Sequence, residues 1–153
     1  MALLKTVGLC KYFGGLKAVN HVDMEVQQGQ VFGIIGPNGA GKTTFFNLCA
    51  GTIPATEGEI WFDGKNITGY RPHMAAKTGI ARTFQNIRLF SDMRVIENVL
   101  VGAHIKTKYD FFSSIFRTKK FKDEEDEITY NALKVLQEVG LYDRRDDYAS
   151  NLP

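Results

Sequence analysis

The chain has little of what marks several classes of protein. Its only two cysteines, Cys10 and Cys49, lie far apart without a CxxC spacing. The spacing therefore indicates neither a zinc site nor a disulfide framework, and it fits a reducing compartment. No apolar run approaches the roughly 18 residues that span a bilayer, and the start, MALLKTVGLC, lacks the layout of a signal peptide. Nineteen basic and 17 acidic residues leave a net charge of +2, too small an excess to favour nucleic acid as a partner.

The residues that are present predict a folded α/β domain. A chain of 153 residues with 44% hydrophobic and 24% charged residues can bury a core. The predicted strands are 3–10, 18–26, 31–35, 59–62 and 79–84, with turns at 14–15, 27–30 and 63–64. The predicted helices are 43–50, which Gly51 ends, 94–104, and an amphipathic helix that follows the switch in charge from KKFK at Lys119 to DEEDE and has Ile128, Ala132, Val135, Leu136 and Val139 on its apolar face. The acidic block 123–127 is expected in the first turn of that last helix, where it would complement the helix dipole.

The chemistry is concentrated in a glycine-rich stretch, GPNGAGKTT, between the predicted strand 31–35 and the predicted helix 43–50. It matches the P-loop pattern GxxxxGK[ST]. Small residues let backbone N–H groups approach phosphate oxygens, and a helix N-terminus adds partial positive charge. The predicted nucleotide-binding residues of this loop are Gly36, Pro37, Asn38, Gly39, Ala40, Gly41, Lys42, Thr43 and Thr44.

Three side chains of the loop have distinct predicted roles. The Lys42 ammonium is expected to reach the β- and γ-phosphates of ATP, and the Thr43 hydroxyl is expected to bind Mg²⁺. Thr44 is expected to donate to the α-phosphate. The loop thus predicts ATP and Mg²⁺ as ligands.

A P-loop alone does not distinguish kinases, GTPases, motor ATPases and transporters. The stretch LCKYFGGLKAVNHVDMEVQQGQVFGIIGPNGAGKTTFFNLCAGTIPATEGEIWFDGKNI resembles the opening of ABC transporter ATPases through its whole length. The resemblance implies a P-loop NTPase fold in which residues 1–90 form an antiparallel β subdomain, the P-loop core and the Q-loop, while 91–153 begin a helical subdomain. It also implies that Phe13, rather than Tyr12, stacks on adenine. Gln85, in GIARTFQN, would be the Q-loop residue that contacts Mg²⁺ and the attacking water and couples the site to the transmembrane partner.

A second stretch, RTFQNIRLFSDMRVIENVLVGAH followed by an insertion at 105–122, resembles the ATP-binding subunits of high-affinity branched-chain amino acid importers. This resemblance implies a peripheral protein at the cytoplasmic face of the inner membrane. Its partners would be transmembrane permease subunits, a second ATP-binding subunit and, indirectly, a substrate-binding protein. The aromatic residues of the insertion are expected either to dock a partner or to pack against neighbouring helices.

Several later motifs of the family are absent from this sequence. It contains no LSGGQ-like signature and no apolar run ending in Asp-Glu, and His21, His73 and His104 are misplaced for the switch histidine. We therefore expect the N-terminal part of the family domain, with an incomplete core sheet, able at most to bind ATP. Strand 31–35 would lack its neighbours, which predicts self-association of the chain. A non-catalytic nucleotide-binding or regulatory module remains the alternative, whereas a soluble kinase or GTPase is disfavoured because no NKxD stretch occurs.

Overall fold

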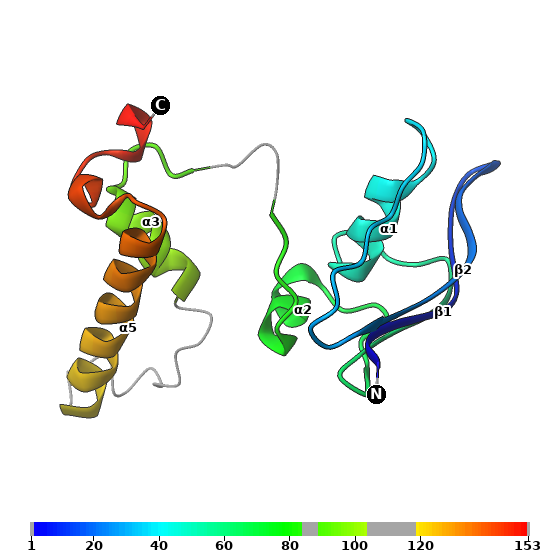
Figure 1. Ribbon diagram of the computed structural model, residues 1–153, viewed down its shortest axis with the longest axis horizontal. Coiled ribbons are helices and arrows are strands. Elements are labelled where there is room, and N and C mark those ends of the chain that lie inside the picture. Colours follow the sequence, from blue (N-terminus) through cyan, green and yellow to red (C-terminus); the bar gives the residue numbers. More distant parts are fainter. Residues whose placement is uncertain (1, 84–88, 104–118, 153) are drawn as a thin grey trace. The chain divides into compact units, whose positions relative to one another are not determined.

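The computed structural model describes residues 2–83, 89–103 and 119–152, without the side chains of 119–121 (Figure 1). The chain divides into two compact units, Met1–Thr83 and Phe84–Pro153. Each unit is described below by itself. The expected Q-loop residue Gln85 and residues 105–118 of the insertion lie outside the described residues.

An antiparallel sheet forms the frame of the first unit. Its strands are β1 (Ala2–Phe13), β2 (Leu16–Gln27), β3 (Glu57–Phe62) and β4 (Lys65–Asn66), in the order β2-β1-β3-β4. All three neighbouring pairs are antiparallel. The predicted turn at 14–15 joins β1 to β2 and places Phe13 opposite Leu16. The predicted antiparallel β subdomain is therefore confirmed.

Helix α1 (Lys42–Cys49) packs its apolar face against this sheet and completes a small core. The buried cluster contains Leu9, Val19, Phe45, Leu48, Cys49, Ile60 and Ile67. Each large apolar side chain buried in this way contributes about 1.5–3 kcal/mol. The helix ends before Gly51, as the sequence predicted. A further helix, α2 (Pro72–Thr78), was not predicted.

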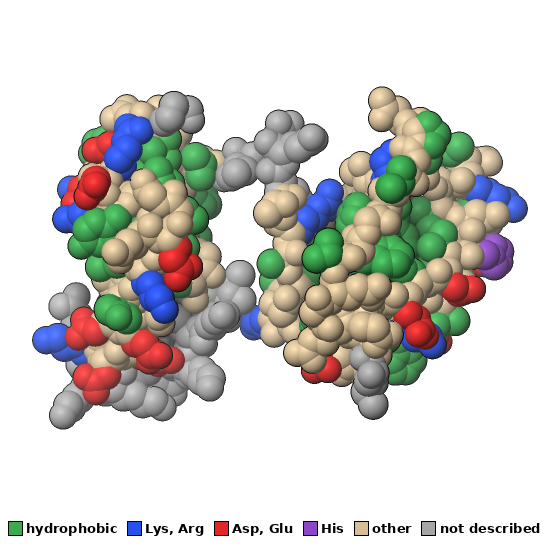
Figure 2. Space-filling view, in the orientation of Figure 1, with side chains coloured by type: hydrophobic (Ala, Val, Ile, Leu, Met, Phe, Trp, Pro, Cys, Tyr) green, Lys and Arg blue, Asp and Glu red, His purple; other side chains and the backbone are tan. Residues whose placement is uncertain are grey.

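The prediction of strands at 31–35 and 79–84 is wrong, as far as the structure describes these residues. Residues 31–35 and 80–83 have no regular secondary structure. A strand forms only where a neighbouring strand satisfies its backbone groups, and within the described ranges no strand pairs with either segment. Val31 is 99% exposed and Ile35 97%, in line with the expectation that this segment lacks neighbouring strands, although Ile34 packs partly against the core. Figure 2 shows hydrophobic side chains open to view on this unit.

The second unit contains α3 (Val95–Ala103), α5 (Lys119–Glu138) and the 3-10 turns η2 (Tyr142–Arg144) and η3 (Ala149–Asn151). The segment after α5 returns to the start of α3. The N–H of Val95 donates to the oxygen of Asp147 at 2.9 Å, and the N–H of Ile96 donates to that of Arg145 at 3.0 Å. In the described ranges, no helix combines the length and apolar character needed to cross a membrane.

Helix α5 corrects two details of the prediction. It begins at Lys119, so the acidic block 123–127 lies beyond the first turn. The expected contact of this block with the positive end of the helix is therefore wrong. Of the predicted apolar face, Ala132 and Leu136 are buried, while Val135 and Val139 are 46% and 61% exposed.

Candidate functional site

The glycine-rich loop and the β1–β2 hairpin line a cavity of about 350 Å³. Its lining residues are Phe13, Leu16, Lys17, Ala18, Asn38, Gly39, Ala40, Gly41, Lys42, Thr43 and Thr44. The predicted loop residues from Asn38 onward therefore meet the predicted aromatic residue Phe13 at one place. Gly36 and Pro37 do not line the cavity.

The ammonium of Lys42 contacts the backbone of the glycine-rich loop. Its Nζ donates to the carbonyl oxygens of Gly36 and Pro37, each at 2.6 Å. Both acceptors are neutral, so neither compensates the positive charge of the ammonium. A bound anion can supply that compensation, and hydrogen bonds to charged groups are about twice as strong as neutral ones.

Close contact between the loop and β2 requires a glycine at position 41. Gly41 has φ +81°, and an added Cβ would overlap the carbonyl oxygen of Ala18 on β2. Gly39 has a similar φ of +84° but faces open space. Only a residue without a Cβ adopts this conformation without strain at such a close approach, and this packing sets the loop against the hairpin.

The N-terminus of α1 points its positive end at the cavity. Gly41 is the N-cap and provides no side-chain hydrogen bond, and the first turn carries no acidic residue. Thr43 and Thr44, in that turn, both line the cavity. The first N–H groups of a helix have no partner within it, so an uncapped end of this kind suits an anion. The loop, the ammonium and the helix end together fit a phosphate chain.

Of the two aromatic candidates for stacking on adenine, Phe13 and Tyr12, the hairpin places only one on the cavity. Phe13 is 48% exposed and lines the cavity. Tyr12 does not line it, and the Lys17 ammonium lies 5.6 Å from the centre of its ring. A hydrogen bond to the Cys10 thiol, together with burial, raises the pKa of Tyr12 to about 12. The structure thus brings the preferred ring, Phe13, to the loop.

The sequence analysis missed three residues of the lining, Leu16, Lys17 and Ala18. They follow the turn at 14–15, and Leu16 pairs with Phe13 across the hairpin. That pairing was a usable signal, because a residue opposite a site residue on a tight hairpin lies near the same site. Lys17 thus contributes to the lining, although its ammonium lies against the ring of Tyr12.

The region leading to Gln85 is held beside the loop's helix. The Arg82 guanidinium donates to Asn47 Oδ1 on α1. Gln85 itself lies outside the described residues, so its contact with Mg²⁺ stays a prediction, as does the Mg²⁺ role of Thr43.

Comparison with known proteins decides the family. A family model described as ABC transporter matches residues 19–152. The chain belongs to the ABC transporter family. The predicted family and its α/β fold are therefore confirmed.

Curated relatives in the ABC transporter family carry a narrower description. The chain is 45% identical over 139 residues to the high-affinity branched-chain amino acid transport ATP-binding protein BraF of Pseudomonas aeruginosa, covering 91% of this chain and 54% of that protein. It is 41% identical over 150 residues to LivG of Escherichia coli, which has the same description, covering 98% and 59%. The chain thus spans little more than half the length of these relatives.

Solved structures of ABC transporter cassettes have the same fold. A nucleotide-free ATP-binding cassette from an ABC transporter has a TM-score of 0.78 and 37% identity, covering 100% of this chain and 60% of that one. An ATP-binding cassette of an ABC transporter in its ADP conformation gives the same TM-score and identity, with 100% and 59% covered.

Proposed function

We propose that this chain binds Mg-ATP in the cavity between the glycine-rich loop and the β1–β2 hairpin. We further propose that it forms the nucleotide-binding part of the ATP-binding subunit of a branched-chain amino acid importer. One observation carries the proposal: an ammonium held by two neutral carbonyls lies beside an uncapped helix N-terminus and an exposed aromatic ring, all on one cavity.

Phosphate recognition is assigned to the loop and the start of α1. Lys42 exchanges its two carbonyl acceptors for oxygens of the β- and γ-phosphates, which carry the negative charge that the carbonyls lack. The backbone N–H groups of residues 39–44 surround the phosphate chain. The Thr43 hydroxyl is a ligand of Mg²⁺, and Thr44 donates to the α-phosphate.

Base recognition is assigned to Phe13. Its ring is already about half exposed at the end of β1, so stacking on adenine buries apolar surface without any rearrangement of the core. The Lys11 ammonium lies 5.2 Å from the centre of the ring. A cation near one part of the ring does not prevent stacking, because a flat ring offers two faces.

The role of the whole protein rests on its similarity to the curated relatives. Hydrolysis of bound ATP supplies the free energy for transport. We propose that the complete protein works with transmembrane permease subunits, a second ATP-binding subunit and a substrate-binding protein, at the cytoplasmic face of the membrane. The relatives' names support branched-chain amino acids as the cargo.

A binding titration tests the proposal for this chain. The purified protein is titrated with a fluorescent ATP analogue and Mg²⁺, and saturable binding is expected. Lys42→Ala is expected to weaken binding by about 10- to 100-fold, since hydrogen bonds to charged groups contribute ~1.5–3 kcal/mol each.

A matched variant shows whether the effect is specific. Lys77→Ala removes a lysine of α2 that does not line the cavity, and it is expected to leave the affinity unchanged. Circular dichroism checks that both variants keep the parent's secondary structure. Absence of binding by the parent, or equal affinities for parent and Lys42→Ala, would refute the proposal.

A further inference from the structure

Three side chains that commonly bind metal ions meet on the sheet of the first unit, and none of them lines the nucleotide cavity. Cys10 lies on β1, His21 on β2 and Glu57 on β3. The sulfur, a ring nitrogen and a carboxylate oxygen all lie within 4.8 Å of one another. Ligands of a tetrahedral zinc ion are ~3.5 Å apart, given metal–ligand bonds of ~2.0–2.3 Å. Small rotations of His21 and Glu57, which are both exposed, can close this gap.

Strand pairing brings these three residues together. Cys10 lies directly opposite Glu57 in the pairing of β1 with β3. On its other side, the register of β1 with β2 shifts between Leu9 and Lys11, which places a bulge of β2 beside Cys10. His21 lies in this bulge with φ +48°, a left-handed conformation that few non-glycine residues adopt. Bulges redirect side chains and are frequent beside functional sites.

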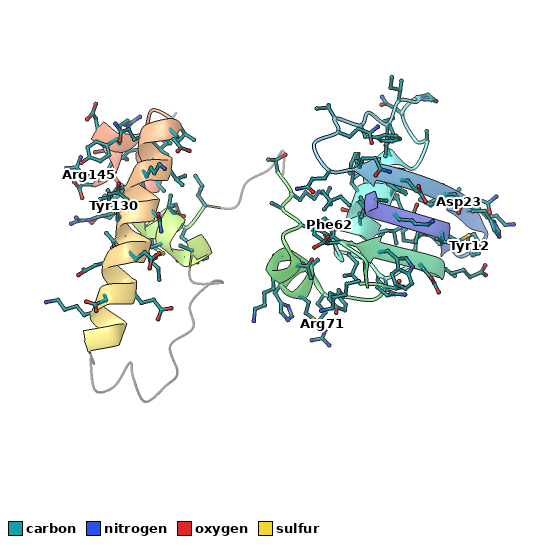
Figure 3. All side chains as sticks on the ribbon, turned by 60° about the horizontal axis from the view of Figure 1, so that its bottom comes forward. Tyr12, Asp23, Phe62, Arg71, Tyr130 and Arg145 are labelled. Carbon is teal, nitrogen blue, oxygen red and sulfur yellow. The ribbon has the colours of Figure 1, made fainter. Side chains whose placement is uncertain are left out.

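The surroundings of Cys10 are polar, although its side chain is fully buried. Cys10 does not belong to the apolar cluster beneath α1. Its sulfur accepts the backbone N–H of His21 at 3.1 Å and lies 3.4 Å from the carbonyl oxygen of Gly8. The His21 ring is held by a contact of 3.0 Å between its Nδ1 and Asn20 Oδ1. Contacts of this kind orient the ligands of metal ions. Figure 3 labels Tyr12, two residues after Cys10 on β1, and Asp23, two residues after His21 on β2.

We propose that Cys10, His21 and Glu57 form a zinc site, with water as the fourth ligand. A thiolate and a carboxylate balance the charge of Zn²⁺, and the imidazole binds as a neutral ligand. Sulfur and nitrogen ligands disfavour Mg²⁺ and Ca²⁺, which bind oxygen. The site is separate from the proposed nucleotide site. A bound ion cross-links β1, β2 and β3, and it thereby braces the strand that carries Phe13 at its end.

Cobalt substitution provides a direct test, because a Co²⁺ ion bound by a thiolate has an intense charge-transfer absorption. The 153-residue chain is titrated with Co²⁺ in buffer that contains excess Mg²⁺, and Zn²⁺ is then added. We expect one equivalent of Co²⁺ to produce the thiolate band and Zn²⁺ to abolish it. His21→Gln and Glu57→Gln change exposed side chains, and each is expected to weaken Co²⁺ binding by at least about tenfold.

A third ligand variant and two matched controls identify the ligands. Cys10→Ser is expected to remove the band, whereas Cys49→Ser and His73→Gln are expected to retain it. Circular dichroism shows whether Cys10→Ser is folded. If it is not, His21→Gln and Glu57→Gln, which change exposed side chains, still test the site. The proposal is overturned if the parent shows no band, if the band depends on Cys49, or if His21→Gln and Glu57→Gln bind Co²⁺ as tightly as the parent.

Discussion

Replacing Gly41 by alanine, compared with the same change at Gly39, separates two contributions to stability: the close packing of the P-loop against β2 and the left-handed backbone conformation. Gly41 and Gly39 have nearly the same positive φ, +81° and +84°. An added Cβ at Gly41 would overlap the oxygen of Ala18 and lie 3.2 Å from its carbonyl carbon, whereas at Gly39 it would meet nothing within 4 Å. Gly39→Ala is therefore a matched control that shares only the conformational strain.

The two substitutions are expected to differ by the energy of the overlap. Left-handed backbone costs an alanine about 1–2 kcal/mol, partly offset by the lower entropy of the unfolded chain. Gly39→Ala is therefore expected to lower the free energy of unfolding by about 1 kcal/mol. An overlap with fixed backbone adds roughly 1–3 kcal/mol, so Gly41→Ala is expected to lose about 2–4 kcal/mol in total.

Urea unfolding followed by the fluorescence of Trp61 measures this difference. Trp61 is the only tryptophan and lies on β3 of the same unit. With a slope of ~1–3 kcal/mol per molar urea, the midpoint of Gly41→Ala is expected about 1 M below that of Gly39→Ala. Gly41→Ala is also expected to lose binding of the ATP analogue. Equal midpoints for the two variants would refute the argument that the loop is held against β2 by close contact.

Three further outcomes are expected. Phe13→Ala should weaken binding of the ATP analogue about tenfold, because stacking of a base on an aromatic ring contributes ~1–3 kcal/mol; an equal loss in Tyr12→Ala would contradict the assignment of the ring. Burial raises the pKa of the Cys49 thiol from 9.0 to about 11, so the folded state retains a proton that the unfolded chain releases. The resulting stability, about 3 kcal/mol, is present below pH 9 and is lost as the pH rises towards 11; urea midpoints of the parent and Cys49→Ala that change in parallel with pH would exclude it. Replacing the exposed Val31 and Ile35 together by lysine should shift the size distribution in light scattering towards the monomer, because charge opposes apolar association and edge pairing; an unchanged distribution would show that these residues do not mediate association.

Local sequence signals predicted the parts of the fold that near neighbours decide. The turn at 14–15, the loop from Gly36 and the end of α1 before Gly51 depend on residues that are adjacent in the chain. Helix α2 carried comparable signals, with Pro72 in its first turn and Gly79 after its end, but it buries only Ala75. The apolar periodicity on which the prediction relied was therefore missing.

The wrong predictions concerned segments whose structure depends on a neighbouring strand or on the position of a helix start. Strands at 31–35 and 79–84 have suitable side chains, but a strand requires a neighbouring edge, and composition does not report whether one is present. The position of the block 123–127 depended on where α5 begins, at Lys119. Helix starts are poorly fixed by an apolar pattern that appears only in the later turns.

The sequence by itself determined the P-loop, because that motif is contiguous and its chemistry follows from the local backbone. The resemblance of the surrounding stretches indicated the family, and the preference for Phe13 came from that resemblance. Only the tertiary structure decided that Lys17 joins the cavity, that Val31 and Ile35 are exposed, and that Cys10 meets His21 and Glu57. Each of these facts depends on which distant residues lie nearby, and Val31 and Ile35 are exposed because none covers them in the described parts of the chain. The meeting of Cys10, His21 and Glu57 arises from the register of three paired strands, in which a shift by one residue turns a side chain to the opposite face of the sheet.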